Sequence, residues 1–196
     1  MSVLPIYLYG TQVLRKKAHS VEELDDETVK LVYDMFETLR TSNGIGLAAT
    51  QVGSLKRVIV VDISDVEAEP DGEPSPQAEG PEAKPQKLVM INPTVVSGSG
   101  TWSMEEGCLS IPNLHGTVER AEEITVRYRD GNYRTQELTA GGLLARVILH
   151  EIDHLDGVLF IDRMEKTERA LLRSQLNDIK SGNVETSYPV VTASEE

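Results

Sequence analysis

Apolar residues recur at helical spacing in three segments of the chain, residues 25–40, 141–155 and 165–179. Positions three and four apart in a helix lie on one face, so each segment predicts a helix with one buried side. Acidic residues precede the first segment and favour a helix N-terminus there, and Gly157 follows the second segment as a C-terminal stop. We expect the middle helix to be largely buried.

Extended segments lie between these helices. Residues 57–61 and 88–93 are short runs rich in branched apolar side chains, and each predicts a strand. Residues 123–129 alternate polar and apolar positions, and an Asp-Gly pair separates them from residues 133–138, which together predict a hairpin. We therefore predict an α+β fold: antiparallel β-sheets pack around the central buried helix, with an amphipathic helix near the N-terminus and another near the C-terminus.

The composition changes between the first two predicted strands. Residues 64–86 are rich in Pro, Gly, Glu and Asp, with Lys84 as the only base. Such a segment buries too little apolar surface to offset the entropy of ordering it, so we expect a mobile acidic insertion and not a linker between domains. The polar residues 181–196 are expected to fray. We predict a single domain over residues 1–196.

The charge of the chain limits its partners. It carries 19 Lys and Arg against 32 Asp and Glu, for a formal net charge of −13. This charge opposes broad adhesion to nucleic acid or to an anionic membrane, so we expect neither DNA nor a membrane as partner. No apolar run has the length of a membrane span, and the first ten residues lack the features of a signal peptide. We expect a cytoplasmic monomer in which the single cysteine, Cys108, stays reduced.

The middle helix contains the run His150-Glu151-Ile152-Asp153-His154. Residues four apart point from the same face of a helix, so His150 and His154 can bind one metal ion with Glu151 beside them. The thiolate of Cys108 is the third candidate ligand. Two imidazoles and one thiolate leave a tetrahedral ion one position short, which is typical of a catalytic metal site and not of a structural one.

Other interpretations of these residues remain open. The two histidines could be core residues that hydrogen-bond to carboxylates. Cys108 could be a small buried apolar residue or a catalytic nucleophile. His115 could act as a fourth ligand and close the site, although the intervening Pro112 favours a chain that leads away. Asp153 could orient a ligand histidine or simply form a salt bridge.

Three motifs in this order, residues 44–51, 106–110 and 150–154, resemble those of the peptide deformylases. The first reads Gly-Ile-Gly-Leu-Ala-Ala-Thr-Gln and the second Glu-Gly-Cys-Leu-Ser. The likeness includes Ile91-Asn92-Pro93 and extends to about Met164, but leaves out residues 64–86. It implies an α+β metalloenzyme that removes the formyl group from the N-terminal formylmethionine of newly synthesised polypeptides and releases formate.

The resemblance also implies the site chemistry. Cys108, His150 and His154 would hold one divalent ion, Fe²⁺ with Zn²⁺, Ni²⁺ or Co²⁺ as substitutes, because this donor set accepts several ions. Glu151 would serve as general base and then as general acid. The Gln51 side-chain amide and the Leu109 backbone N–H would form an oxyanion hole.

Substrate contacts are implied as well. Backbone groups of Ile45, Gly46 and Gly107 would hold the formylated peptide in an extended pose. The residues implied for the methionine pocket are Leu143, Arg146 and Val147, together with Ile45 and Glu106. Arg146 suits such a pocket only if its stem lies along the wall while its charged end reaches water.

Two rival functions share parts of this pattern. A metalloendopeptidase has the same helix pentad and differs in the third ligand and the oxyanion donors, whereas a non-enzymatic metal-binding module would have a fourth protein ligand. The predicted C-terminal helix presents cations that could contact ribosomal RNA transiently, although its acidic residues dilute this charge and favour a solvated face. These cations are Lys166, Arg169, Arg173 and Lys180.

Overall fold

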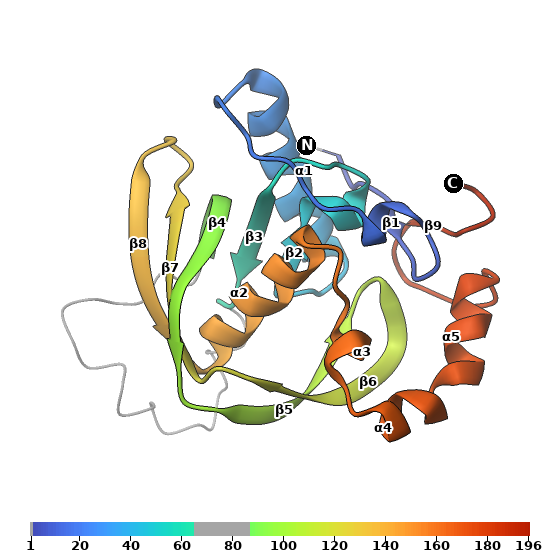
Figure 1. Ribbon diagram of the computed structural model, residues 1–196. Helices are drawn as coiled ribbons and strands as arrows, with labels where there is room; N and C mark the ends of the chain where they lie inside the picture. The colour runs from blue at the N-terminus through green and yellow to red at the C-terminus, as the bar shows by residue number, and fades with distance from the viewer. Residues whose placement is uncertain (1, 65–86) are drawn as a thin grey trace.

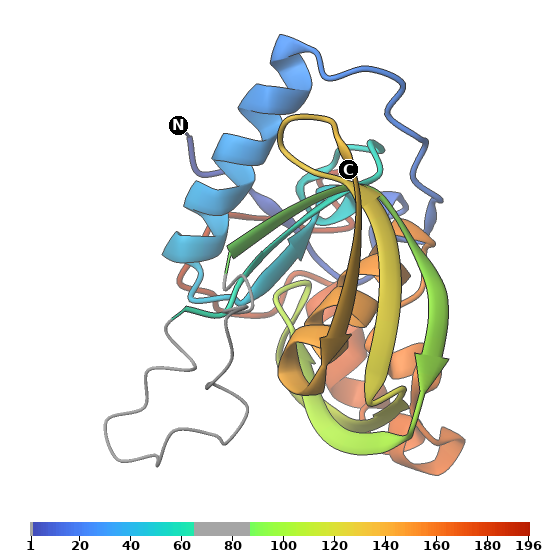
Figure 2. The same ribbon diagram turned by 90° about the vertical axis from the view of Figure 1, so that its left-hand side faces the viewer.

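A computed structural model describes residues 2–64 and 87–196. The predicted acidic insertion lies outside these residues, apart from Ser64. Figures 1 and 2 show a mixed α+β fold with antiparallel sheets and few long helices, which confirms the predicted class. No helix in the described part of the chain is long and apolar enough to cross a membrane.

The largest sheet contains five antiparallel strands in the order β2-β3-β4-β7-β8. Their bounds are β2 Gly46–Ala48, β3 Val58–Asp62, β4 Lys87–Ser99, β7 Glu123–Arg129 and β8 Thr135–Gly141. The strands predicted from the β-branched runs correspond to β3 and the first half of β4, and the predicted hairpin corresponds to β7 and β8. Strand β2 forms one edge of this sheet.

Two smaller sheets flank the first. Strands β5 (Trp102–Cys108) and β6 (Ile111–Arg120) form an antiparallel hairpin, and β1 (Ile6–Tyr7) pairs in parallel with β9 (Val190–Val191). The sequence patterns predicted neither sheet. In β6 the buried positions do alternate with exposed ones, but they include Gly116 and Arg120, so apolar residues alone do not reveal the period.

Helix α1 spans Asp26–Thr41 and α2 spans Gly142–Leu155, close to the predicted bounds. Asp25 caps α1, because its side chain accepts a hydrogen bond from the Thr28 backbone N–H at 2.7 Å. Short 3₁₀ helices η1 (Val13–Arg15) and η2 (Ala49–Val52) and the helical turn α3 (Phe160–Arg163) complete the main body.

The predicted helix over residues 165–179 is wrong as a single element. The structure has α4 (Lys166–Leu171) and α5 (Arg173–Lys180), separated at Leu172. Leu171, an apolar residue of this predicted helix, is 81% exposed, whereas Leu176 and Ile179 pack into the core. The break at Leu172 therefore lets α5 pack its apolar residues into the core, and this packing stabilises the fold more than a continuous helix would.

The expectation that residues 181–196 fray is also corrected. Strand β9 lies in this segment and pairs with β1, and the Glu196 carboxylate accepts a hydrogen bond from the backbone N–H of Val13 at 2.9 Å. The segment is anchored by backbone pairing, which a polar side-chain pattern does not reveal.

Strand β3 is buried on both faces, which explains its continuous apolar run. Val58 and Val60 belong to the cluster that packs against α1, while Ile59 and Val61 belong to the cluster that packs against α2. Successive side chains of a strand point to opposite faces, so one strand supplies both cores. The sheet thus separates α1 from α2 and presents α2 toward the β5–β6 hairpin (Figure 1).

Candidate active site

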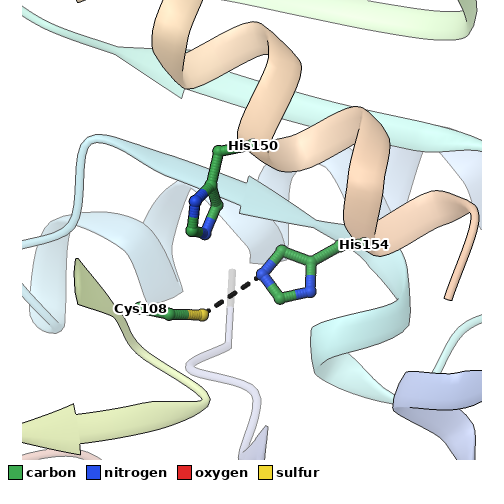
Figure 3. A group of neighbouring side chains, drawn as sticks. All are labelled: Cys108, His150 and His154. Carbon is green, nitrogen blue, oxygen red and sulfur yellow. Dashed lines mark hydrogen bonds between the residues drawn. The ribbon is translucent and has the colours of Figure 1, made fainter. Parts of the chain in front are cut away.

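Helix α2 presents two histidines toward a single point. His150 and His154 are buried, and their ring centroids lie 5.0 Å apart. The sulfur of Cys108 approaches from the β5–β6 hairpin and lies 3.2 Å from His154 Nε2. One ligand atom from each of these three residues lies within 4.8 Å of the other two (Figure 3). Side chains far apart in the sequence therefore converge as a possible metal site.

The turn between β5 and β6 directs the cysteine to this point. Gly107 pairs with His115, but the register shifts at the next residue, so that Cys108 pairs with Ile111 across the Leu109–Ser110 turn. A Cβ on Gly107 would lie 2.8 Å from the His115 ring, so glycine allows this pairing without displacement of that ring. Within the described residues, the possible metal group consists of Cys108, His150 and His154 and leaves out His115. The structure therefore does not support His115 as a fourth ligand.

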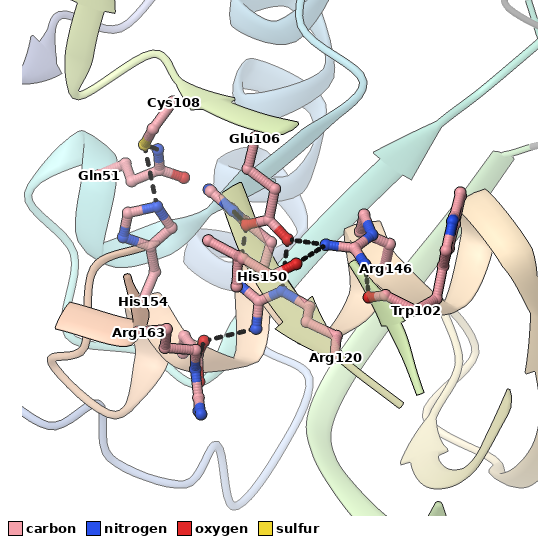
Figure 4. Close-up of polar contacts among 11 residues, drawn as sticks. Gln51, Trp102, Glu106, Cys108, Arg120, Arg146, His150, His154 and Arg163 are labelled. Atoms are coloured by element: carbon pink, nitrogen blue, oxygen red, sulfur yellow. Dashed lines mark hydrogen bonds and ion pairs between the residues drawn. The ribbon is translucent and has the colours of Figure 1, made fainter. Parts of the chain in front are cut away.

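Glu106 fixes the orientation of His150. Its Oε2 lies 2.9 Å from His150 Nδ1, so the Nε2 side of the ring is left for a ligand. Arg120 donates to both carboxylate oxygens, at 2.6 and 2.9 Å, and Arg146 donates to Oε1 at 2.6 Å (Figure 4). Burial alone raises the pKa of Glu106, but the hydrogen bonds from Arg120 and His150 outweigh it and hold the pKa well below its usual range. Glu106 is thus an ionised, buried anchor.

Asp153 forms salt bridges, and among the described residues its carboxylate hydrogen-bonds to neither ligand histidine. Its carboxylate accepts from Arg120 at 2.7 Å and from Arg163 at 2.5 Å. Of the two roles left open for Asp153, the structure shows the salt bridge. Because Arg120 joins Asp153 to Glu106, one continuous ion network runs along α2 beneath the two histidines.

Arg146 lies in this network with its charge already satisfied. Its side chain is buried, paired with Glu106 and positioned over the Trp102 ring at 4.8 Å from the ring centroid. The guanidinium therefore does not reach water. This differs from the expectation that Arg146 lines the pocket with its charged end in water. A buried arginine is tolerated here because Glu106 neutralises it and Trp102 stacks against it.

Glu151 lies between the histidines in sequence and faces the site from α2. It is buried, and burial raises its pKa to about 7. Its Oε2 has no hydrogen-bond partner among the described residues. A Cβ on Gly46 would collide with Glu151 Oε1 and with Val147, so glycine in β2 makes room for the carboxylate.

The two histidines have opposite electrostatic surroundings. Burial and the charge of His150 lower the pKa of His154 well below its ordinary value. For His150 burial acts in the same direction, but hydrogen bonds with Cys108 and Glu106 raise the pKa overall. These surroundings favour the neutral imidazole at His154, the form that offers a nitrogen lone pair to a metal ion.

Gln51 approaches the same point from η2. Its Oε1 accepts from the Ala48 backbone N–H at 2.8 Å. Its Nε2 donates to Ser110 Oγ at 3.3 Å and lies 3.6 Å from the Cys108 sulfur. The contact with Ala48 fixes the orientation of the amide, so that its donor end faces the cysteine.

A cavity of about 500 Å³ opens over these groups. The sequence-predicted residues that line it are Ile45, Gly46, Gln51, Glu106, Gly107, Cys108, Leu109, Leu143, Arg146, Val147, His150 and Glu151. His154 does not line the cavity and reaches the site from below through its ring nitrogen.

Sequence reasoning missed one side of this cavity. Residues 185–188, from the segment expected to fray, also line it. The tyrosine hydroxyl of Tyr188 donates to the Leu109 backbone oxygen at 2.8 Å. The available sequence signal is Tyr188 together with the valines at positions 184, 190 and 191.

Known proteins match this chain over nearly its whole length. A family model described as polypeptide deformylase matches residues 3–170. A peptide deformylase of Salinibacter ruber is 46% identical over 197 residues, covering 99% of this chain and 97% of the relative. One from Chlorobium phaeovibrioides is 43% identical, covering 97% of this chain and 94% of the relative.

Solved structures give the same result. A peptide deformylase from Legionella pneumophila is 36% identical with a TM-score of 0.77, covering 93% of this chain and 98% of that one. The peptide deformylase of Ehrlichia chaffeensis in complex with actinonin is 34% identical with a TM-score of 0.79, covering 94% and 100%. Motifs, geometry and relatives agree: the chain belongs to the polypeptide deformylase family, metal-dependent enzymes that remove the N-formyl group from nascent peptides.

Proposed function

We propose that this chain carries out deformylation with one divalent ion held by Cys108, His150 and His154. The observation that carries the proposal is the convergence of these three donor atoms within 4.8 Å in a largely buried site. The donor set suits Fe²⁺, with Zn²⁺, Ni²⁺ or Co²⁺ as substitutes. When bound, such an ion lowers the pKa of water and polarises the formyl carbonyl.

Glu151 moves the proton. Its carboxylate lies beside the two ligand histidines, and its Oε2 is left without a partner among the described residues, so it can accept a proton from the attacking water. The same group then donates that proton to the departing amine. The absence of a side chain on Gly46 leaves the space that this carboxylate occupies.

Gln51 and the Leu109 backbone N–H stabilise the charge that develops on the formyl oxygen. The Gln51 amide is held by Ala48 with its N–H groups toward Cys108, so it needs no reorientation when the charge forms. Loss of one such donor costs about 2.7–4 kcal/mol of transition-state stabilisation.

The backbone of the substrate binds between two strand edges. Gly46 begins the edge strand β2 of the large sheet and Ile45 directly precedes it, whereas Gly107 belongs to β5. Both sides line the same cavity. An extended peptide placed there pairs its backbone with either edge. This arrangement supports the predicted roles of Ile45, Gly46 and Gly107.

The methionine side chain occupies the part of the cavity beside α2. Leu143 and Val147 offer apolar contact, and the stem of Arg146 adds to it because its charged end is engaged by Glu106. Glu106 contributes to this wall while its carboxylate remains in the ion network. The pocket is therefore apolar in character despite two charged residues.

The setting of the enzyme follows from its substrate. We place it in the cytoplasm as a monomer that meets nascent chains, with α4 and α5 available for transient ribosome contact. Arg169 is already paired with Asp162 at 3.0 Å, which leaves Lys166, Arg173 and Lys180 for such a contact.

An anaerobic preparation tests the proposal. Metal content and formate release would be measured with a formyl-Met peptide and, separately, with an internally cleavable peptide whose N-terminus is blocked. We expect one equivalent of metal and turnover of the first substrate alone. Cleavage of the second substrate without formate release would support the metalloendopeptidase instead.

A further inference from the structure

The two ends of the described chain form a short ribbon beside the active site. In β1 and β9, Ile6 pairs with Val190 and Tyr7 with Val191. The pairing is extended by a hydrogen bond from the Leu8 backbone N–H to Val191 O at 2.9 Å. Figure 1 shows this ribbon apart from the large sheet, near the 3₁₀ helices.

Both strands of the ribbon lead to the turn that follows Cys108. Just after β1, the Tyr9 backbone N–H donates to Ser110 O at 2.8 Å. Just before β9, the Tyr188 hydroxyl donates to Leu109 O at 2.8 Å. Burial and the nearby Cys108 raise the pKa of Tyr188 to about 12, so the phenol keeps its proton. The Leu109–Ser110 turn is thus held from two directions.

The segment before β9 also forms part of the cavity wall. Residues 185–188 line the cavity, and Glu185 and Ser187 are exposed, whereas the α2 residues that line it are buried or half-buried. Exposed lining residues mark the mouth of the cavity, and residues 185–188 form one part of its rim beside exposed residues such as Asn43, Glu105 and His115. Because the substrate is the end of a long polypeptide, the chain beyond its methionine must leave through that mouth.

We propose that residues 185–188 form the wall that contacts the substrate residues following the methionine, and that Tyr188 is a positioning residue for the Leu109 turn. This inference rests on the proposed function and extends it to substrate selection. The wall acts on peptides long enough to reach the mouth, while Tyr188 acts on every substrate through the backbone that carries the Leu109 N–H.

The positioning role is tested with Tyr188→Phe, which removes only the hydroxyl. Tyr33→Phe is the matched control, because Tyr33 is 55% exposed on α1. With formylmethionine amide as substrate, we expect kcat of Tyr188→Phe to fall roughly three- to tenfold, because one hydrogen bond is lost. KM and metal content should stay unchanged. An unchanged kcat, or a loss matched by lost metal, would overturn the role.

The wall is tested with Ser187→Trp, which narrows the mouth. Asn183→Trp places the same bulk in the tail at a residue that does not line the cavity. We expect KM to rise at least roughly fivefold for a formylated pentapeptide in Ser187→Trp, with KM for formylmethionine amide unchanged and no effect in the control. If KM for the pentapeptide in Ser187→Trp stays at the parental value, or rises equally for both substrates, residues 185–188 do not form the proposed wall.

The parent enzyme separates the two levels of inference. Turnover of formylmethionine amide by the unmodified protein requires the metal site, Glu151 and the oxyanion donors, and does not require contacts between residues 185–188 and a longer peptide. Failure there would reject the proposed function, whereas a fully active parent with unaffected variants would reject only the role of residues 185–188.

Discussion

The two sides of the cavity are built in different ways. On one side α2 presents buried residues that an ion network of Glu106, Arg120 and Asp153 holds in place. On the other side a two-residue strand and a single tyrosine hydroxyl position an exposed segment. The reacting groups therefore sit on the more buried and more highly connected scaffold, and the substrate exit lies on the less connected one. Substitutions on the first side should alter the chemistry most. On the second side, substitutions in the exposed wall should alter substrate selection, and loss of the Tyr188 hydroxyl should lower kcat only modestly.

The largest effect is expected from Glu151→Gln on the α2 side. The amide cannot carry a proton, so kcat should fall by about a hundred- to ten-thousand-fold. Metal content should stay at the parental value because no ligand is removed. Metal analysis alongside a formate assay checks both points, and a metal-free variant would contradict the assigned role.

Gln51→Ala should come next. Removing the amide takes away one donor to the developing oxyanion, and we expect kcat to fall by about a hundredfold or more, with KM nearly unchanged. Steady-state kinetics on formylmethionine amide provides the measurement. A rise in KM at constant kcat would instead indicate that Gln51 binds substrate and transition state equally.

Glu106→Gln tests whether the ion network supports the metal. The neutral amide leaves Arg120 and Arg146 poorly compensated in a buried site, so the free energy of unfolding should fall by about 3 kcal/mol. Metal affinity should weaken roughly ten- to a hundredfold, because His150 loses its anionic partner. Urea denaturation and competition with a chelator give the two values.

Arg163→Ala is the control for that experiment. Its side chain is 45% exposed, and Asp153 keeps its bond to Arg120, so we expect a loss of at most about 1 kcal/mol and parental metal affinity. If both variants lose the same free energy of unfolding and the same metal affinity, Glu106 is no more important to the network than Arg163.

No effect on the metal site is expected from a change on the opposite side of the cavity. Deleting residues 184–196 removes β9 and its few hydrogen bonds, so the free energy of unfolding should fall by about 2 kcal/mol. The three metal ligands are untouched, and metal content should remain parental. Loss of metal in this variant would show that the two sides of the cavity are not independent.

The same division describes what the sequence can predict. Helix α2 and its ligands follow from spacing within a few residues, and β3 follows from a continuous β-branched run that both faces of the sheet bury. The hairpin β5–β6 and the ribbon β1–β9 depend on backbone pairing between segments, and the side-chain pattern of these segments does not predict that pairing. Backbone pairing is available to nearly every residue, so a local pattern carries little information about it.

The site residues show the same limit. Cys108, His150 and His154 were found by residue type, since few side chains bind metals through sulfur and imidazole. Glu106 was expected in the methionine pocket, and only its distance to His150 Nδ1 indicates that it orients a ligand. Tyr188 acts through a hydroxyl on a backbone oxygen, an interaction that any tyrosine could make.

Gly46 contributes no functional group, yet the catalytic carboxylate depends on it. The empty space above its α-carbon is the only room for Glu151 Oε1 and Val147 on that side of β2. Even a single methyl group there would displace the acid from its neighbours on α2. Substitution of Gly46 by any larger residue is therefore restricted by the space beside its α-carbon, although Gly46 itself takes no part in proton transfer.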